Sequence, residues 1–168
     1  MIFIALGSNL PLSNETDGTD VLRAAVRAME KRGMQVVARS RLYKSEPVPI
    51  SDQDWYVNAV VCIITSLEPE RLLNVLHEIE ADFGRQRTIK NAARELDLDI
   101  LDFKGRISKD ETAPPLLPHP RMEGRAFVLL PLHDIAPKWC HPITGVSLSD
   151  LIDLADPDQR IQALEEAW

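Results

Sequence analysis

Apolar residues in the first hundred positions of this chain follow two different periods, and the order of those periods restricts the possible folds. In residues 20–33 and 69–84 they recur every three or four positions, which is typical of an amphipathic helix. Four other segments are β-branched or alternate polar and apolar residues, as strands do. These predicted strands are residues 1–6, 35–43, 57–65 and 95–102. The predicted order is therefore strand, helix, strand, strand, helix, strand.

This βαββαβ order predicts an α+β, ferredoxin-like fold, in which an antiparallel sheet carries both helices on one face. We expect Asp20 to cap the first helix and Gly33 to end it. The remaining residues are expected to form a C-terminal extension. It contains a Pro-rich loop at 112–121, an apolar element of undetermined type at 125–132, a helix at 147–155 capped by Ser147, and a helical tail from residue 158.

The length of 168 residues predicts a single domain over 1–168, because domains commonly have about 100–200 residues. Within it we expect the ferredoxin-like core at about 1–103 and the loop and helical extension at about 104–168. The net charge of −7 argues against a nucleic-acid partner, since nucleic-acid-binding proteins usually carry a basic surface. Any anion must therefore be bound by a local cluster of cations.

No segment reaches the ~20 apolar residues that a membrane-spanning helix needs. The two cysteines, Cys62 and Cys140, form no disulfide framework, and we expect both to be buried free thiols. No long exposed apolar stripe is evident. We therefore expect a cytoplasmic protein without a membrane partner and in the monomeric state.

Asp97 and Asp99 are the clearest candidates for chemistry. Side chains two residues apart on a strand point to the same face, about 6.6–6.8 Å apart along the chain. Two neighbouring carboxylates repel each other unless a cation lies between them, and oxygen ligands without cysteine suit Mg²⁺. A solvated strand face would show the same pair, so the pattern alone leaves both interpretations open.

The segment 85–94 favours the interpretation as a phosphate site. It holds four Lys or Arg residues and no acid, and it leads directly into the predicted strand with Asp97 and Asp99. Cations beside a metal-binding acid pair are expected where a polyphosphate lies between them. His119, Arg121 and Arg125 add further positive or ionisable groups. Ordinary surface ion pairs remain the alternative explanation.

Tyr56 and Asn58 share a face at the start of another predicted strand. An aromatic ring beside an amide suits a planar heterocycle with donor and acceptor edges, although packing explains the pair equally well. The sequence contains no P-loop, no nucleophile elbow and no zinc-ligand spacing. A covalent or zinc-dependent mechanism is therefore not indicated.

Several short segments together resemble the 6-hydroxymethyl-7,8-dihydropterin pyrophosphokinase family. Their combination and order are specific, and they extend from residue 2 to about residue 145. They are residues 4–10, 52–58, 79–87, 94–100, 117–121, 125–132 and 134–137.

The resemblance implies Mg²⁺-dependent transfer of the terminal diphosphate of ATP to the hydroxymethyl group of the dihydropterin, with release of AMP, in folate biosynthesis. The family's ferredoxin-like core agrees with the order of elements. Two Mg²⁺ ions would be held by Asp97 and Asp99, and Asp97 would assist deprotonation of the hydroxyl.

The resemblance also implies roles for other residues. The phosphates would be bound by Arg85 and Arg94 and, from the far side, by His119 and Arg125. The adenosine would lie near Arg87 and Ile100. The pterin ring would be held between Tyr56 and Phe127, at its edge by Asn58, and by main-chain groups of Ser45 and Val48.

Two alternatives remain. The chain departs from many relatives at residues 91–93, which are Asn-Ala-Ala in place of an aromatic-Gly-Pro stretch. A non-catalytic ferredoxin-like nucleotide-binding module with an altered loop would show this departure. A different nucleotide transferase with paired aspartates would act without a pterin. Tyr56, Asn58 and Phe127 favour the pyrophosphokinase, because a bare nucleotide site does not require them.

Overall fold

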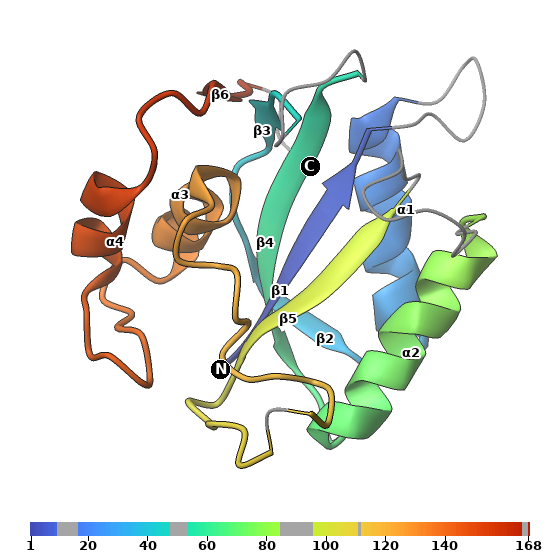
Figure 1. Cartoon of the computed structure of the whole chain (residues 1–168). Helices are drawn as coiled ribbons and strands as arrows, with labels where there is room; N and C mark the ends of the chain where they lie inside the picture. Colours follow the sequence, from blue (N-terminus) through green and yellow to red (C-terminus); the bar gives the residue numbers. More distant parts are fainter. Residues whose placement is uncertain (10–16, 48–53, 85–95, 111, 166–167) are drawn as a thin grey trace.

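The structure, a computed structural model, describes residues 1–9, 17–47, 54–84, 96–110, 112–165 and 168. Its elements follow the predicted order through the first part of the chain, with two strands in place of the one expected at 35–43 (Figure 1). They are β1 (Ile2–Ser8), α1 (Gly18–Lys31), β2 (Gln35–Arg39), β3 (Tyr43–Ser45), β4 (Tyr56–Ile64), α2 (Pro69–Asp82), β5 (Asp97–Phe103), α3 (Ala126–Ile135), α4 (Leu148–Leu154) and β6 (Ile161–Ala163).

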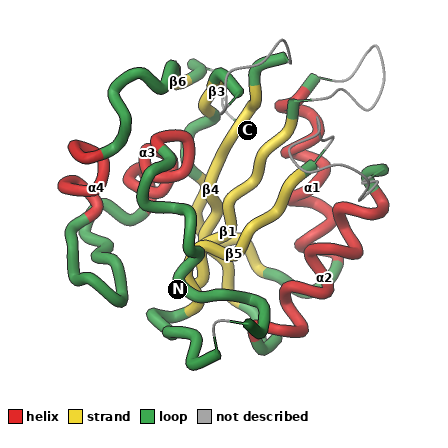
Figure 2. The backbone as a smooth tube through the Cα atoms, in the orientation of Figure 1, coloured by secondary structure: helices red, strands yellow, loops and turns green. Residues whose placement is uncertain are grey.

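The described strands form one antiparallel sheet in the order β5-β1-β4-β3-β6, and β2 pairs with the other end of β4. The helices α1 and α2 cover one face of this sheet, and α3 and α4 cover the other (Figures 1 and 2). The predicted ferredoxin-like core, with its first two helices on one face, is thereby confirmed. No helix in the described ranges is long and apolar enough to cross a membrane.

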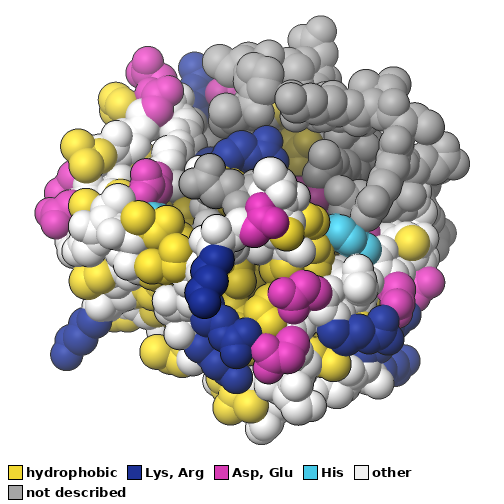
Figure 3. Space-filling model, turned by 60° about the horizontal axis from the view of Figure 1, so that its bottom comes forward, with side chains coloured by type: hydrophobic (Ala, Val, Ile, Leu, Met, Phe, Trp, Pro, Cys, Tyr) yellow, Lys and Arg dark blue, Asp and Glu magenta, His cyan; other side chains and the backbone are white. Residues whose placement is uncertain are grey.

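Each face of the sheet has its own apolar core. Leu22 of α1 and Leu76 of α2 pack against Ile4 and Val61 on one face, whereas α3 and α4 pack against Val60 and its neighbours on the other. Strand β4 is buried on both faces over most of its length, which explains its nearly continuous apolar sequence. On the surface shown in Figure 3, basic and acidic side chains lie next to each other.

Helix α1 begins earlier than expected. Its N-cap is Asp17, whose side chain accepts a hydrogen bond from Asp20 N at 3.0 Å, so the prediction that Asp20 caps the helix is wrong. The predicted end is confirmed, because Gly33 follows the helix with φ +80°, a conformation that glycine adopts without strain. The predicted cap of α4 is also confirmed, since Ser147 Oγ accepts from Asp150 N.

Three other expectations were wrong. The single strand expected at 35–43 is two strands with a break at Ser40. Ser40 N still donates to Val60 O at 2.9 Å, but its Oγ, in place of its carbonyl, accepts the hydrogen bond from Val60 N at 2.9 Å. The tail is not helical: β6 pairs with β3, whose outer edge requires backbone partners. Cys140 is exposed, while Cys62 is buried as expected.

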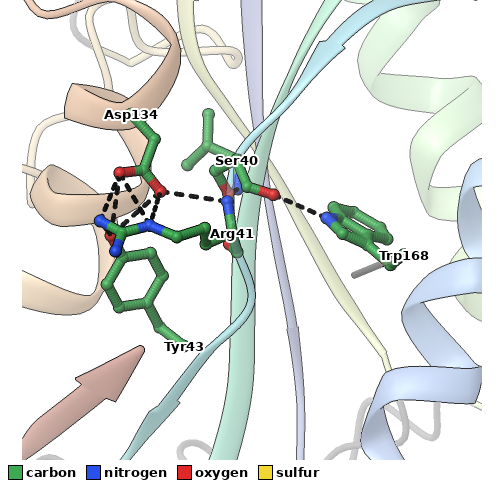
Figure 4. Close-up of polar contacts among 6 residues, drawn as sticks. Ser40, Arg41, Tyr43, Asp134 and Trp168 are labelled. Carbon is green, nitrogen blue, oxygen red and sulfur yellow. Dashed lines mark hydrogen bonds and ion pairs between the residues drawn. The ribbon is translucent and has the colours of Figure 1, made fainter. Parts of the chain in front are cut away.

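Asp134 near the end of α3 connects this helix to the segment between β2 and β3 (Figure 4). Its carboxylate accepts hydrogen bonds from Arg41 N at 3.0 Å, from Arg41 Nη2 at 2.8 Å and from the Tyr43 hydroxyl at 3.0 Å. Burial raises the pKa of Asp134, but the hydrogen bonds from Arg41 and Tyr43 outweigh this effect and leave the pKa below its ordinary value. This cluster joins α3 to the sheet.

Candidate active site

Asp97 and Asp99 lie on the face of β5 that α3 covers. The residue between them, Leu98, and the following Ile100 belong to the core formed with α1 and α2 on the opposite face. Both aspartates are partly exposed. The prediction that their side chains share one face is confirmed, and it follows from the alternation of side chains along a strand.

A loop before α3 brings His119 to these acids. His119 N donates to Leu101 O at 2.9 Å, which ties the loop to β5. The ring nitrogen Nδ1 accepts a hydrogen bond from Arg121 N at 3.2 Å, and Nε2 lies 3.7 Å from Asp99 Oδ2. Since Nδ1 is an acceptor, the neutral ring carries its proton on Nε2, on the side of Asp99.

The charges in this cluster act on one another. Burial raises the pKa of Asp99, and the neighbouring charge of Asp97 raises it further. His119, Arg125 and Arg121 oppose this rise. Burial lowers the pKa of His119, and the two arginines lower it too, whereas Asp99 acts in the opposite direction. The acids would therefore be stabilised by an additional cation.

This donor set fits Mg²⁺. Two carboxylates that are half-buried on one face and repel each other offer hard oxygen ligands to a small divalent cation. Mg²⁺ usually takes only one or two protein carboxylates and completes its shell with water and substrate phosphates. Asp97 and Asp99 supply that number, and the basic residues nearby suit a phosphate.

A second group of polar residues lies on the same face, at the start of β4. Asn58 is buried, and its Nδ2 donates to Ser45 Oγ at 2.8 Å. The register pairs Tyr56 with Ser45 across the sheet, so these side chains also share this face. Tyr56 is partly exposed. The sequence pair Tyr56 and Asn58 thus faces the same side as the acids.

Gly7 of β1 separates the two groups. It pairs in register with Asn58 on one side and with Asp97 on the other, so the three residues form a row across the sheet. Since adjacent strands are about 4.8 Å apart, Asn58 and Asp97 stand about 10 Å apart at their Cα atoms. Gly7 has no side chain on this face, and a Cβ there would lie 3.5 Å from Asn58 Oδ1.

Helix α3 contributes from above this face. Arg125 directly precedes the helix, and its guanidinium carbon lies 5.6 Å from the centre of the Phe127 ring. Phe127 is partly buried against the core between the sheet, α3 and α4. The structure therefore gathers residues from β3, β4, β5, α3 and the loop before α3 at one side of the sheet.

Other expected site residues are placed differently or fall elsewhere. The side chain of Ile100 is 3% exposed and lies in the core on the opposite face, so a contact of this residue with adenosine would involve its backbone. Val48, Arg85, Arg87 and Arg94 lie outside the described residues.

Two residues near the acids were given no individual role in the sequence predictions. Arg121 was noted beside His119, and its charge acts on both His119 and Asp99. Glu80 of α2 is fully buried, and its Oε1 accepts a hydrogen bond from Leu98 N at 2.9 Å. The sequence signals for Glu80 were its place beside the apolar stripe of a helix and within the resembling segment 79–87, and neither specifies a partner.

Comparison with known proteins assigns a family. A model of the family 7,8-dihydro-6-hydroxymethylpterin-pyrophosphokinase (HPPK) matches residues 3–137. The chain is 41% identical to the 2-amino-4-hydroxy-6-hydroxymethyldihydropteridine pyrophosphokinase of Pseudomonas aeruginosa, over 99% of this chain and 98% of that protein. It is 38% identical to the protein of the same name from Methylorubrum extorquens, over 92% and 93% of the two chains.

Longer proteins and solved structures are also similar. The chain is 38% identical to the folic acid synthesis protein fol1 of Pneumocystis carinii over 90% of its own residues, but it spans only 20% of that protein's length. It resembles the crystal structure of wild-type Plasmodium falciparum HPPK-DHPS with a TM-score of 0.68 and 14% identity, covering 91% of this chain and 44% of that one. At this identity the structural likeness supports the fold alone.

Proposed function

Because this chain belongs to the 7,8-dihydro-6-hydroxymethylpterin-pyrophosphokinase family, we propose that it transfers diphosphate from ATP to the hydroxymethyl group of 6-hydroxymethyl-7,8-dihydropterin and releases AMP. This is a step of folate biosynthesis. The observation that carries the proposal is the row Asn58–Gly7–Asp97, which sets a group suited to a heterocycle beside a pair of acids suited to Mg²⁺.

Asp97 and Asp99 would hold Mg²⁺ together with the triphosphate, with two ions as our proposal for the number. Bound Mg²⁺ would neutralise phosphate charge and lower the pKa of the substrate hydroxyl. Asp97, on the side of Gly7 and Asn58, would assist in removing the hydroxyl proton. A reaction of this kind requires mainly positioning and charge stabilisation, which agrees with the absence of a sequence motif for a covalent nucleophile.

The phosphates would be bound by cations on the other side of the cluster. The Nε2 proton of His119 lies on the side of Asp99, where it could be donated to a phosphate oxygen. Arg125 would add a guanidinium from the start of α3. Arg85 and Arg94 would contact the phosphates, and Arg87 and the backbone of Ile100 the adenosine.

The dihydropterin would lie between Tyr56 and Phe127. The hydrogen bond from Asn58 Nδ2 to Ser45 orients the amide, so that Asn58 Oδ1 can accept a hydrogen bond from the edge of the ring. Main-chain groups of Ser45 and Val48 would complete this contact. Asn58 is buried, so its Oδ1 would lose free energy if it had no hydrogen-bond partner in the complex. A ring that offers no donor to Asn58 Oδ1 would therefore bind more weakly.

An assay of AMP release tests the function directly. We expect AMP from ATP only when both Mg²⁺ and the dihydropterin are present, and loss of AMP when the metal is chelated. Formation of ADP, or AMP release that does not depend on the pterin, would contradict the proposal. Calorimetric binding of a non-hydrolysable ATP analogue by a chain that releases no AMP would support the non-catalytic nucleotide-binding module.

We further propose that residues 1–168 form one domain, with the ferredoxin-like core at about 1–103, and that it acts as a cytoplasmic monomer. The unpaired Cys62 and Cys140 support a reducing compartment. The exposed large apolar residues of the described chain come from several separate elements, among them Val37 of β2 and Leu154 of α4. Light scattering of the purified protein measures the oligomeric state, and a mass of two chains would refute the monomer.

A further inference from the structure

Glu80 is a carboxyl group inside the apolar core between α2 and β5. Its side chain has no solvent exposure, and it stands next to Ile79, which belongs to the apolar face of the helix. Burying a carboxyl group costs free energy unless it makes hydrogen bonds, and an apolar side chain at this position would avoid that cost. The position therefore calls for an explanation beyond packing.

One hydrogen-bond partner of Glu80 is the backbone of β5. Strand β5 is at the edge of the sheet and pairs only with β1 among the described strands. Glu80 Oε1 accepts the hydrogen bond from Leu98 N at 2.9 Å. The glutamate thus supplies, for one amide of this edge, the acceptor that a neighbouring strand would provide elsewhere.

The amide that Glu80 holds belongs to the peptide group between Asp97 and Leu98. Rotation of this peptide group would turn the side chain of Asp97. The same movement would displace Asp99, which directly follows Leu98. The two carboxylates stand on one face of β5, while Glu80 holds the strand from the side of α2. The hydrogen bond therefore restrains the spacing and direction of both acids.

We propose that Glu80 is a positioning residue that sets Asp97 and Asp99 for binding a divalent cation with ATP. The inference rests on the proposed function, because it assumes that these two aspartates hold the metal. Groups that orient metal ligands without contacting the metal commonly contribute about 10- to 100-fold to metal affinity. Glu80 acts through a backbone amide, so its contribution requires an acceptor at Oε1 rather than a negative charge.

The substitutions Glu80→Gln and Glu80→Ala distinguish a requirement for an acceptor at Oε1 from a requirement for a negative charge. Glutamine keeps an oxygen acceptor in the same place, whereas alanine removes it. The binding of Mn²⁺ to each variant in the presence of a non-hydrolysable ATP analogue is measured by electron paramagnetic resonance, which requires no turnover. We expect E80A to weaken Mn²⁺ binding about 10-fold or more and E80Q to remain within about 3-fold of the unmodified protein.

Asp102 offers a matched control. It is also a buried acid of β5, and it accepts hydrogen bonds from Gly105 N and from Trp139 Nε1, both at 2.7 Å, but it is not part of the acid pair. We expect D102A to lower the melting temperature, as E80A does, while it leaves Mn²⁺ affinity unchanged. If Glu80 had a purely structural role, E80A would behave like D102A, with a lower melting temperature and unchanged Mn²⁺ affinity.

Several results would overturn the proposal. Mn²⁺ affinity that is unchanged in E80A, or that falls equally in E80A and E80Q, would exclude positioning through the acceptor. If E80A does not fold, Glu80→Asp replaces it, because the shorter acid would not reach Leu98 N, and an unchanged affinity in E80D would overturn the idea equally. Failure of the proposed function is a separate outcome, namely the absence of pterin-dependent AMP release from the unmodified protein.

Discussion

Replacing Tyr43 by phenylalanine removes one hydroxyl group from the cluster that joins α3 to the sheet. The Tyr43 side chain is buried, and its hydroxyl donates to Asp134 at 3.0 Å and accepts from Arg41 Nη2 at 2.8 Å. A hydrogen bond to a charged group contributes about 1.5–3 kcal/mol to stability. Asp134 keeps the donors of Arg41, so we expect Y43F to cost about 1.5–2 kcal/mol.

This loss is large enough to measure by calorimetry or thermal melting. For a chain of this size about 1 kcal/mol shifts the melting temperature by roughly 2–4 °C, so Y43F should melt about 3–8 °C lower at neutral pH. Arg41 is solvent-exposed, and water can replace its lost partner. The phenyl ring fills the same space, and no cavity adds to the cost.

The pH dependence of this difference provides a second test. Burial and then the hydrogen bond to Asp134 raise the pKa of Tyr43 to about 12, from 10.0 for an ordinary tyrosine. A raised pKa means that the folded state binds the proton more tightly. The stability contributed by Tyr43 is therefore complete below pH 10 and is lost as the pH rises towards 12.

The chain has only two tyrosines, so the near-ultraviolet absorbance of tyrosinate in Y43F reports Tyr56 alone. Subtracting the absorbance titration curve of Y43F from that of the unmodified protein gives the titration curve of Tyr43. A Y43F variant that melts with the unmodified protein at neutral pH would refute the assigned strength of the cluster. A stability difference that stays constant from pH 10 to pH 12, or a Tyr43 that titrates near 10, would refute its buried environment.

Three further outcomes are expected. Asp97→Asn should abolish Mg²⁺-dependent AMP release without lowering the melting temperature, because it relieves the repulsion with Asp99; a clearly lower melting temperature would contradict this account. Asn58→Ala should weaken dihydropterin binding by about 10-fold, the equivalent of about 1.4 kcal/mol, measured by calorimetry, and unchanged affinity would remove Asn58 from the site. A thiol reagent should modify Cys140 rapidly and Cys62 only on unfolding, since Cys62 is buried and burial raises its pKa; two fast thiols would contradict the described core.

Local patterns in the sequence predicted most of the core. The helical periodicity of 69–84 and the apolar run of 57–65 correspond to α2 and β4 within one or two residues. Ser147 and Gly33 were recognised because a cap and a left-handed glycine act within a few residues of the chain. The shared face of Asp97 and Asp99 followed from strand geometry alone, once the strand had been assigned.

Local sequence patterns did not predict features that depend on contacts between distant segments. β6 is a strand because β3, more than a hundred residues earlier, offers it an open edge, whereas its own sequence suggested a helix. At the break at Ser40, the hydroxyl of Ser40 accepts the hydrogen bond from Val60 N of β4 in place of the Ser40 carbonyl, which accepts from Trp168 Nε1. Neither feature leaves a local signal, since the deciding partner is far away in the chain.

The residues of the candidate site illustrate the same division. Their chemical types were readable, because carboxylates, guanidiniums and an amide have properties that do not depend on the fold. Their arrangement in space could not be read from the sequence, because it depends on the register of the paired strands. Gly7 stands between Asn58 and Asp97 through pairing of three strands, and Glu80 reaches Leu98 through the packing of α2 on β5. Side-chain chemistry is a local property, whereas distances between groups arise only when hydrogen-bonded strands and packed helices bring remote residues together.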